Sequence, residues 1–244
     1  MTKYDDLDTR CSAYTCTAPF ALDNELIIKG YANRILEIAH GTSLLELGIG
    51  HGYSCKIFAE KFKRHVIIEG SKEIIDSFVK SNVDIQSSIY HSLFEEYTTT
   101  DKFDIIVIGF VLEHVDDPIF ILKKYKRFLK KKGIMFVVVP NAMTLVRRIG
   151  YAAGMLDDYM KLTPFDIELG HKRSYTVSSL KETIKNAGLN EVRTEGVFLK
   201  TMTTDQLERL QLPKSILMGM IKVGINYPEL CVGIMEVCNE NRIS

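Results

Sequence analysis

Alternating glycines behind a carboxylate are the part of the sequence whose residue types and spacing point to chemistry. Glu46 lies near the end of a short apolar run, and Gly48, Gly50 and Gly52 follow it. Residues 53–62 then carry apolar side chains at helical spacing, so we expect a buried strand, a glycine turn and a helix. Glycine lets the backbone turn tightly and lets a ligand approach main-chain atoms. The pattern predicts a nucleotide-binding site beyond the first strand.

The spacing of this turn also indicates which nucleotide binds. A dinucleotide fingerprint would place its third glycine at position 53, where the chain has Tyr53. The carboxylate of Glu46 would repel a pyrophosphate, whereas it suits a ligand that carries positive charge. S-adenosyl-L-methionine is such a ligand, because it has a sulfonium and an ammonium group. We therefore expect S-adenosyl-L-methionine as the cofactor, and a dehydrogenase is the weaker alternative.

Glu69 is the second carboxylate of the predicted site. It ends the apolar segment 65–69, which we expect to be the second strand, and it follows the glycine turn by about twenty residues. An acid at this place accepts hydrogen bonds from ribose hydroxyls in nucleotide-binding α/β folds. Dehydrogenases share this feature, so it supports the cofactor assignment only together with the glycine turn.

Several segments resemble motifs of the seven-strand, or class I, S-adenosylmethionine-dependent methyltransferases. The stretch from Glu46 to Gly52 has the form of their first motif. The pair Glu113-His114, after the apolar segment 103–107, is similar to the fourth motif of small-molecule members such as those of ubiquinone biosynthesis. Residues 170–176 resemble an acceptor-side segment of bacterial methyltransferases in polysaccharide and small-metabolite pathways. The resemblance extends over residues 40–238.

This resemblance implies a role for each part of the predicted cofactor site. The first motif would surround the methionine moiety, Glu69 would hold the ribose, and residues 92–94 would contact the adenine. His91 stands where many relatives have an aspartate, which leaves the adenine contact open. Tyr14 either closes over the cofactor carboxylate or is an ordinary packed tyrosine. The candidate cofactor-binding residues are Glu46, Gly48, Gly50, Tyr14, Glu69, Gly70, Ser71, Ser92, Leu93, Phe94 and Phe110.

The same resemblance gives no reason to expect a metal ion. The ubiquinone-type enzymes have a further acid three residues before the Glu-His pair, and that acid is implicated in metal binding. This chain has Phe110 at the corresponding position. We therefore carry over no metal ligand.

Two histidines are the candidate catalytic residues. Methyl transfer from a sulfonium is an in-line displacement, and the acceptor must lie within about 3–3.5 Å of the methyl group. If the acceptor is a hydroxyl, a general base must take its proton. His114, which follows the predicted strand 103–109, acts as this base, orients the acceptor, or simply bonds a loop carbonyl or the cofactor. We prefer His171 as the base, and a solvated turn is the alternative for its segment.

The residues around His171 indicate the kind of acceptor. Lys172 and Arg173 follow it, and three cationic or titratable groups in a row favour an anionic or polyhydroxylated acceptor that Arg173 clamps. Tyr175 and Asn141 are further candidate substrate-binding residues, and Asn141 alternatively caps its turn. We expect O-methylation of a small polar acceptor such as a sugar, a sugar nucleotide or a capsule-related phosphorylated metabolite. An N- or C-methyltransferase and a non-catalytic, cofactor-binding regulatory protein are the alternatives.

The overall composition argues against other function classes. Lys plus Arg equals Asp plus Glu at 31 each in 244 residues, so no basic excess indicates nucleic-acid binding. The longest uncharged apolar run, residues 105–112, is too short to span a membrane. The N-terminus lacks the apolar core of a signal peptide, which predicts a cytoplasmic protein. The 5 cysteines have no zinc spacing and are expected to be buried or idle thiols.

The order of the predicted elements gives the fold class. Strand and helix patterns alternate over residues 41–140, which implies right-handed crossovers and a doubly wound, Rossmann-like α/β sheet. We expect seven mostly parallel strands, with residues 83–89 as the third, residues 134–139 as the fifth, and an antiparallel edge from residues 191–199 and 230–237. The predicted parts are an N-terminal cap segment and helix (1–40), a cofactor-binding core (41–140), an acceptor lid (141–175) and the rest of the same domain (176–244).

Overall fold

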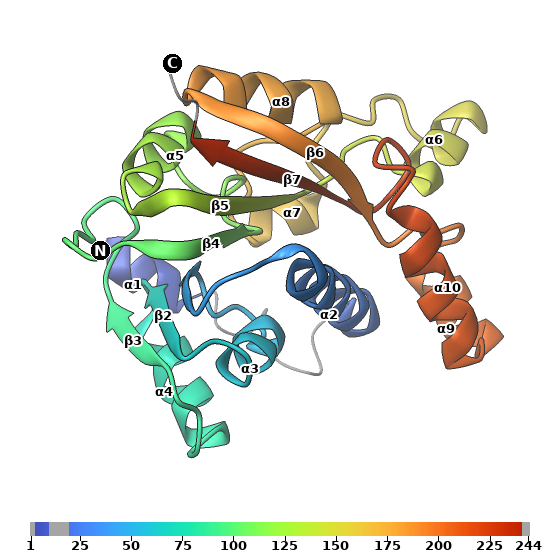
Figure 1. Ribbon diagram of the computed structural model, residues 1–244. Helices are drawn as coiled ribbons and strands as arrows, with labels where there is room; N and C mark the ends of the chain where they lie inside the picture. The colour runs from blue at the N-terminus through green and yellow to red at the C-terminus, as the bar shows by residue number, and fades with distance from the viewer. Residues whose placement is uncertain (1–2, 10–19, 241–244) are drawn as a thin grey trace.

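The computed structural model describes residues 3–9 and 20–240 (Figure 1). Tyr14 and the cysteines at positions 11 and 16 lie outside these ranges, so their predicted roles are not addressed by the structure. Cys55, Cys231 and Cys238 are buried free thiols. Within the described ranges, no helix has both the length and the apolar character needed to cross a membrane.

The core of the molecule is a seven-stranded sheet in the order β3-β2-β1-β4-β5-β7-β6. The strands from β1 to β5 pair in parallel, whereas β7 runs antiparallel to both of its neighbours. This confirms the predicted Rossmann-like sheet with antiparallel pairing at one edge. The reversed strand β7 is the second strand from that edge, and β6 is the edge strand. The strands are β1 (Ser43–Leu47), β2 (Arg64–Glu69), β3 (Ser88–His91), β4 (Phe103–Gly109), β5 (Leu129–Pro140), β6 (Leu189–Val197) and β7 (Gly233–Glu240).

Helices cover both faces of this sheet (Figure 1). On one face, α5 and α8 pack on side chains of β1, β2 and β4, and on the other face α2 and α3 pack on side chains of β1, β4 and β5. Because both faces are covered, all five residues of β1 are buried, as expected for a central parallel strand. The helices of the layers are α2 (Ala21–Ile38), α3 (Tyr53–Ala59), α4 (Lys72–Ser81), α5 (Pro118–Lys126) and α8 (Val177–Asn186).

Further helices lie near the N-terminus and between the later strands. Residues 141–175, the predicted acceptor lid, contain two of these helices, and the excursion between β6 and β7 contains two more. These further helices are α1 (Lys3–Asp8), α6 (Leu145–Ala152), α7 (Pro164–Glu168), α9 (Thr204–Leu210) and α10 (Lys214–Gly224).

The predicted starts of β3 and β5 were wrong by five residues each, and the predicted bounds of β6 and β7 were displaced by two or three residues. β3 begins at Ser88, and Val83, which the prediction placed in the strand, is 83% exposed in a polar turn. β5 begins at Leu129, because the Phe103 amide donates to the Phe128 carbonyl at 2.8 Å and so pairs the start of β4 with the chain directly after α5. The exposed lysines at 130–132 then lie in an irregular first part of β5 rather than at a helix end.

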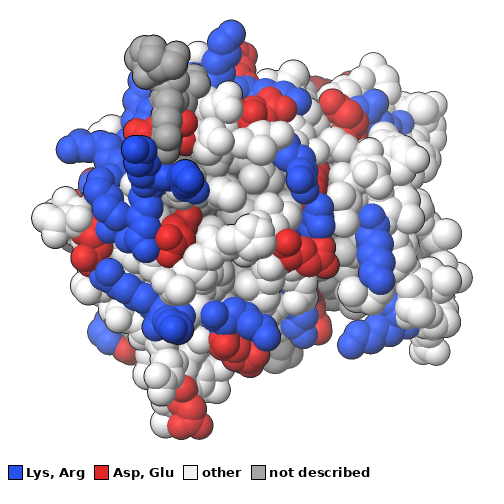
Figure 2. Space-filling model, viewed as in Figure 1, with Lys and Arg blue, Asp and Glu red and all other residues white. Residues whose placement is uncertain are grey.

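The charged surface residues are mixed in sign. Figure 2 shows acidic side chains among the basic ones across the face that it presents. This distribution fits the equal totals of acidic and basic residues in the sequence. The absence of a nucleic-acid partner stays a prediction.

Glu236 is a buried carboxyl within the antiparallel edge of the sheet. Its Oε1 accepts a hydrogen bond from the Thr194 hydroxyl on β6 at 2.9 Å, whereas its Oε2 has no partner among the described residues. Burial raises the pKa of this carboxyl to about 7, and the charge of Glu191 raises it further while Lys181 lowers it. The folded protein therefore binds a proton here that the unfolded chain releases near pH 4.5.

Replacing Glu236 by Gln should stabilise the protein in neutral to alkaline solution. Because the folded-state pKa is the higher one, the stability of the wild type falls as pH rises from about 4.5 to about 7 and is level above that range. We expect Glu236→Gln to gain about 1–3 kcal/mol of unfolding free energy at pH 8 and little at pH 4.5. Urea unfolding at both pH values measures this difference. The exposed Glu240→Gln on the same strand is the control, and an equal gain at both pH values would contradict the explanation.

Candidate active site

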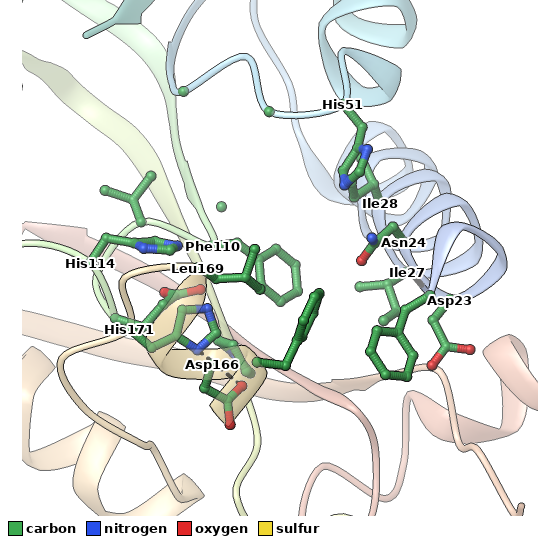
Figure 3. A pocket seen from close by; sticks show the side chains of 18 of the residues that line it. Asp23, Asn24, Ile27, Ile28, His51, Phe110, His114, Asp166, Leu169 and His171 are labelled. Atoms are coloured by element: carbon green, nitrogen blue, oxygen red, sulfur yellow. Dashed lines mark ion pairs between the residues drawn. The ribbon is translucent and has the colours of Figure 1, made fainter. Parts of the chain in front are cut away.

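A cavity of about 790 Å³ opens at the carboxyl ends of β1, β2 and β4. Ligands bind in this place in open α/β sheets. The loops after these strands, α2 and the segment that contains α6 and α7 all contribute residues to the cavity wall. Figure 3 shows His114, His171 and Asp166 together on the side of the cavity opposite α2.

The glycine turn after β1 forms the floor of this cavity. Gly48 and Gly50, both predicted cofactor residues, line it, and their φ values of 84° and 50° lie in the left-handed region that favours glycine. Gly52 has φ of 73° and begins α3, where a Cβ would approach the Phe78 ring to 2.7 Å. The turn therefore needs glycine both for its backbone conformation and for its packing against α4.

Glu69 ties this turn to the loop that follows β2. Its Oε2 accepts a hydrogen bond from the Ile49 amide at 2.9 Å, and its Oε1 accepts one from the Ser71 amide at 2.8 Å. Burial raises the pKa of the carboxyl, while these backbone donors lower it. Gly70 and Ser71, also predicted cofactor residues, line the cavity beside Glu69. The Ser71 hydroxyl caps α4 and donates to the carboxylate of Asp8 at 2.6 Å.

Glu46, one of the predicted cofactor residues, lies behind the glycine turn and is not part of the cavity wall. The carboxylate is 2% exposed. It accepts a hydrogen bond from the Ser54 hydroxyl at 2.5 Å, and its other oxygen is 2.9 Å from His65 Nε2. Glu46 therefore joins β1 to α3 and β2 within the core, and its effect on a ligand passes through the turn that it supports.

The loop after β3 supplies the predicted adenine end of the cavity. Leu93 and Phe94 line it, whereas the Ser92 hydroxyl donates to the Leu93 carbonyl and the Ser92 side chain lies outside the wall. His91 Nε2 is 3.0 Å from the Gly70 carbonyl oxygen, so His91 joins the ends of β2 and β3. Of the predicted adenine segment, two residues thus face the cavity and one supports the loop.

His114 and His171 come from distant parts of the sequence and meet in the cavity wall. Their rings pack edge to face with centroids 4.8 Å apart, and both line the cavity. Asp166 of α7 lies beside His171, with its Oδ1 3.3 Å from His171 Nδ1. Its other oxygen accepts hydrogen bonds from the backbone and hydroxyl of Thr163 at 2.7 Å, which fixes the carboxylate in a capping box.

Glu113 completes this group of side chains and was not among the predicted site residues. It is 1% exposed, lines the cavity, and neither of its carboxylate oxygens has a hydrogen-bond partner among the described residues. Burial raises the pKa of Glu113 to about 7, while the charges of His171 and Arg173 lower it. Its position next to His114 in the recognised Glu-His pair was the available sequence signal. The signal for Asp166 was the Thr163-Pro164 helix start.

Arg173 does not face the cavity, which corrects its predicted role as an anion clamp. One guanidinium nitrogen donates to the carbonyls of Leu112 at 2.8 Å and Val115 at 2.6 Å, and a second donates to that of Asp116 at 3.0 Å. Arg173 therefore holds the loop after β4, which carries Glu113 and His114. Lys172 borders the cavity but pairs with the exposed carboxylate of Asp116.

Asn141 and Tyr175 also have structural positions rather than predicted contacts with an acceptor. The Asn141 side-chain amide donates to the carbonyls of residues 228, 229 and 231, and its oxygen accepts from the Met143 amide at 2.9 Å. This is the turn-capping alternative. Tyr175 is 3% exposed and pairs through its backbone with Asn141. Neither residue lines the cavity.

The remaining wall of the cavity is largely apolar. Phe110, one of the predicted cofactor residues, lines it with φ of 56°, a left-handed conformation that is rare for a large side chain. At the far end, the buried carboxylate of Asp23 on α2 accepts a hydrogen bond from the Thr204 hydroxyl at 2.9 Å and pairs with Lys200. The apolar residues of this wall include Phe20, Ile27, Phe110, Leu156, Phe165 and Leu169.

Comparisons with known proteins agree with this geometry. The family described as a methyltransferase domain matches residues 23–194. A probable S-adenosylmethionine-dependent methyltransferase of Mycolicibacterium smegmatis is 26% identical over 166 residues, which cover 68% of this chain. The match spans only 58% of that relative's length.

Solved structures show the same fold. An S-adenosylmethionine-dependent methyltransferase of Thermotoga maritima, described as a possible histamine N-methyltransferase, has a TM-score of 0.66 and 15% identity over 98% of this chain and 99% of its own. The Haemonchus contortus phosphoethanolamine N-methyltransferase 2 in complex with S-adenosyl-L-methionine has a TM-score of 0.64 and 13% identity over 99% of this chain and 60% of its own. At these identities the likeness concerns the fold alone.

The sheet order, the glycine turn and the acid at the end of β2 define a class I, S-adenosylmethionine-dependent methyltransferase fold. The family match covers more than half of the residues. The chain therefore belongs to the methyltransferase-domain family, whose methyl donor and cofactor is S-adenosyl-L-methionine.

Replacing Arg173 should destabilise the loop after β4 far more than replacing its neighbour. Arg173→Ala leaves three carbonyl groups without their charged donor, so we expect a loss of about 1–3 kcal/mol in unfolding free energy. Lys172→Ala removes an exposed ion pair and should cost less than about 0.5 kcal/mol. Thermal and urea unfolding of the two variants measure this contrast. Equal stability of the two variants would contradict the structural role of Arg173 and would favour its predicted role in binding the acceptor.

Proposed function

We propose that this protein transfers the methyl group of S-adenosyl-L-methionine to a hydroxyl oxygen of a small polar acceptor. The observation that carries the proposal is the group formed by Glu113, His114 and His171, which lines the same cavity as the glycine turn and Glu69. Titratable side chains at this place are needed when the acceptor must lose a proton, which is the case for a hydroxyl.

The reaction forms an oxygen–carbon bond as the sulfonium–carbon bond breaks, and it leaves S-adenosylhomocysteine and a methyl ether. The proton of the hydroxyl must leave the acceptor. His171 is the group through which we expect this to occur, because Asp166 lies 3.3 Å from its Nδ1 and so leaves Nε2 as the nitrogen available to the acceptor. His114, whose ring packs against that of His171, would orient the hydroxyl.

The acceptor is proposed to be a sugar or a sugar nucleotide, or a molecule that likewise combines hydroxyls with an apolar face. A sugar ring can stack its apolar face on the aromatic wall that includes Phe110 and Phe165 while its hydroxyls reach the histidines. The polar group of Asp23 and Lys200 lies at the other end of this compartment. Arg173 supplies no argument for a phosphate on the acceptor, because its guanidinium is occupied by loop carbonyls.

The cofactor-binding part of the proposal is tested at Glu69. Glu69→Gln keeps the shape of the side chain but removes the charge that accepts from two loop amides and, as proposed, from the ribose hydroxyls. A lost charge-assisted hydrogen bond costs about 1.5–3 kcal/mol, so we expect about 10- to 100-fold weaker binding of S-adenosylhomocysteine. Isothermal titration calorimetry measures this change. Glu73→Gln on the exposed face of α4 is the control, and wild-type affinity in Glu69→Gln would remove Glu69 from the cofactor site.

The catalytic part of the proposal is tested at His171. We expect His171→Ala to lower kcat by about 100-fold or more, because general acid–base groups contribute about 10²–10⁴ in rate. S-adenosylhomocysteine should bind this variant with near wild-type affinity. Radiolabelled methyl transfer to a panel of sugars, sugar nucleotides and hydroxylated aromatic compounds measures activity, with the exposed His40→Ala as the control. An effect of His171→Ala confined to acceptor KM would make this residue a binding group, and no transfer across the panel would favour a non-catalytic protein.

A further inference from the structure

The group formed by Glu113, His114 and His171 has the arrangement of ligands around a metal ion. One donor atom from each residue, a carboxylate oxygen and two imidazole nitrogens, lies within 4.8 Å of the other two. Glu113 and His114 follow β4, whereas His171 follows α7, so the fold brings the three residues together from two segments. Donor atoms bound to one ion at about 2.0–2.2 Å lie about 3–3.6 Å apart, so side-chain movements of about 1 Å would close the group around an ion.

The carboxylate of Glu113 independently indicates a missing partner. It is 1% exposed, and neither oxygen accepts a hydrogen bond from any described residue. A buried carboxylate without a partner is costly, because neither water nor a protein donor compensates its charge. A bound cation at the position that His114 and His171 share would supply this partner.

Asp166 orients the ring of His171 in a way that suits a metal ligand. Metal-bound histidines almost always donate the N–H of their other ring nitrogen to a carboxylate, a carbonyl or a water, which fixes the ring orientation and the tautomer. Asp166 Oδ1 lies 3.3 Å from His171 Nδ1, and the capping box at the start of α7 holds that carboxylate in place. His171 Nε2 is then the nitrogen left for an ion.

We propose that Glu113, His114 and His171 bind one divalent transition-metal ion in the wall of the active-site cavity. Two imidazoles and one carboxylate are a donor set that suits Zn²⁺, Fe²⁺, Co²⁺ or Mn²⁺ better than Mg²⁺, which prefers oxygen ligands. We did not expect this site from the sequence, because Phe110 stands where the ubiquinone-type enzymes have an acid before the Glu-His pair. In this chain His171, from the acceptor lid, takes the third position.

The consequence for chemistry rests on the proposed function. Three protein ligands would leave coordination positions of the ion open to the cavity, and an acceptor hydroxyl held there would release its proton to solvent water at a lower pH than in free solution. His171 Nε2 then serves as a ligand instead of accepting the proton. An acceptor with two adjacent oxygens, as in a sugar diol, can occupy two open positions at once.

The site is tested with Co²⁺, which reports its own coordination through visible absorption. Full-length protein is stripped with a chelator and titrated with Co²⁺ without cofactor or acceptor, by absorption and by calorimetry. We expect one equivalent of Co²⁺ to bind with d–d bands in the visible range and to be displaced by Zn²⁺. Glu113→Gln, His114→Ala and His171→Ala should each weaken binding by more than about 100-fold, and Asp166→Asn by about 10- to 100-fold.

Two controls keep this test decisive. The exposed His40→Ala should bind Co²⁺ as the wild type does, and circular dichroism with thermal unfolding shows whether each variant is folded. Glu113→Gln removes a buried, unpartnered charge and is therefore expected to fold. No Co²⁺ binding by the wild type, or binding that Glu113→Gln and His171→Ala leave unchanged, would overturn the proposal.

The outcome also separates this site from the proposed function. Methyl transfer by chelator-treated enzyme that gains nothing from added Zn²⁺, Co²⁺ or Mn²⁺ would overturn the role of the ion and leave O-methylation in place. Co²⁺ binding lost in Glu113→Gln, together with no methyl transfer to any hydroxylated acceptor, would establish the ion site and overturn O-methylation.

Discussion

The carboxylate of Glu69 is the constraint on which the cofactor side of this structure depends. It is buried at the end of β2 and accepts one backbone amide from the turn after β1 and one from the loop after β2. The two loops that must cradle a nucleoside are thereby fixed to a single side chain. Glu46 supports the same turn from behind through Ser54 and His65. The left-handed glycines complete the arrangement, because they let the chain bend around these carboxylates without a Cβ in the cavity.

The segment that carries His171 is held against the loop after β4 by a different set of contacts. Arg173, which lies near the end of segment 141–175, donates to three carbonyls of the loop after β4, so the segment that carries His171 is joined to the segment that carries Glu113 and His114. Asp166 then orients His171 from within the same segment. The positions of the side chains that we propose for chemistry thus depend on contacts between segment 141–175 and the loop after β4.

The strands, helices and glycine turn could be predicted from local sequence patterns. The partners of individual side chains could not, because they depend on the folded structure. Gly48, Gly50 and Glu69 were identified because strand ends and a tight turn require particular residue types at particular spacings. The contacts of Glu46 behind the turn were not predicted, since the two faces of a strand buried on both sides look alike in sequence. Arg173 was read as a free charge because its carbonyl partners lie some sixty residues away in the chain. Asp166 was missed because a helix-capping acid and a histidine partner look the same before folding.

Phe110 combines two properties that affect how this cavity can change. It takes a left-handed backbone conformation directly after β4, at a cost of about 1–2 kcal/mol for a residue with a Cβ, and its ring forms part of the acceptor wall. A smaller residue here would enlarge the compartment, and glycine would also recover the backbone strain. The relief of this backbone strain would offset part of the packing energy that is lost when a large side chain is removed from the cavity wall. The size of the cavity can therefore be changed at this one position with a small loss of folding stability.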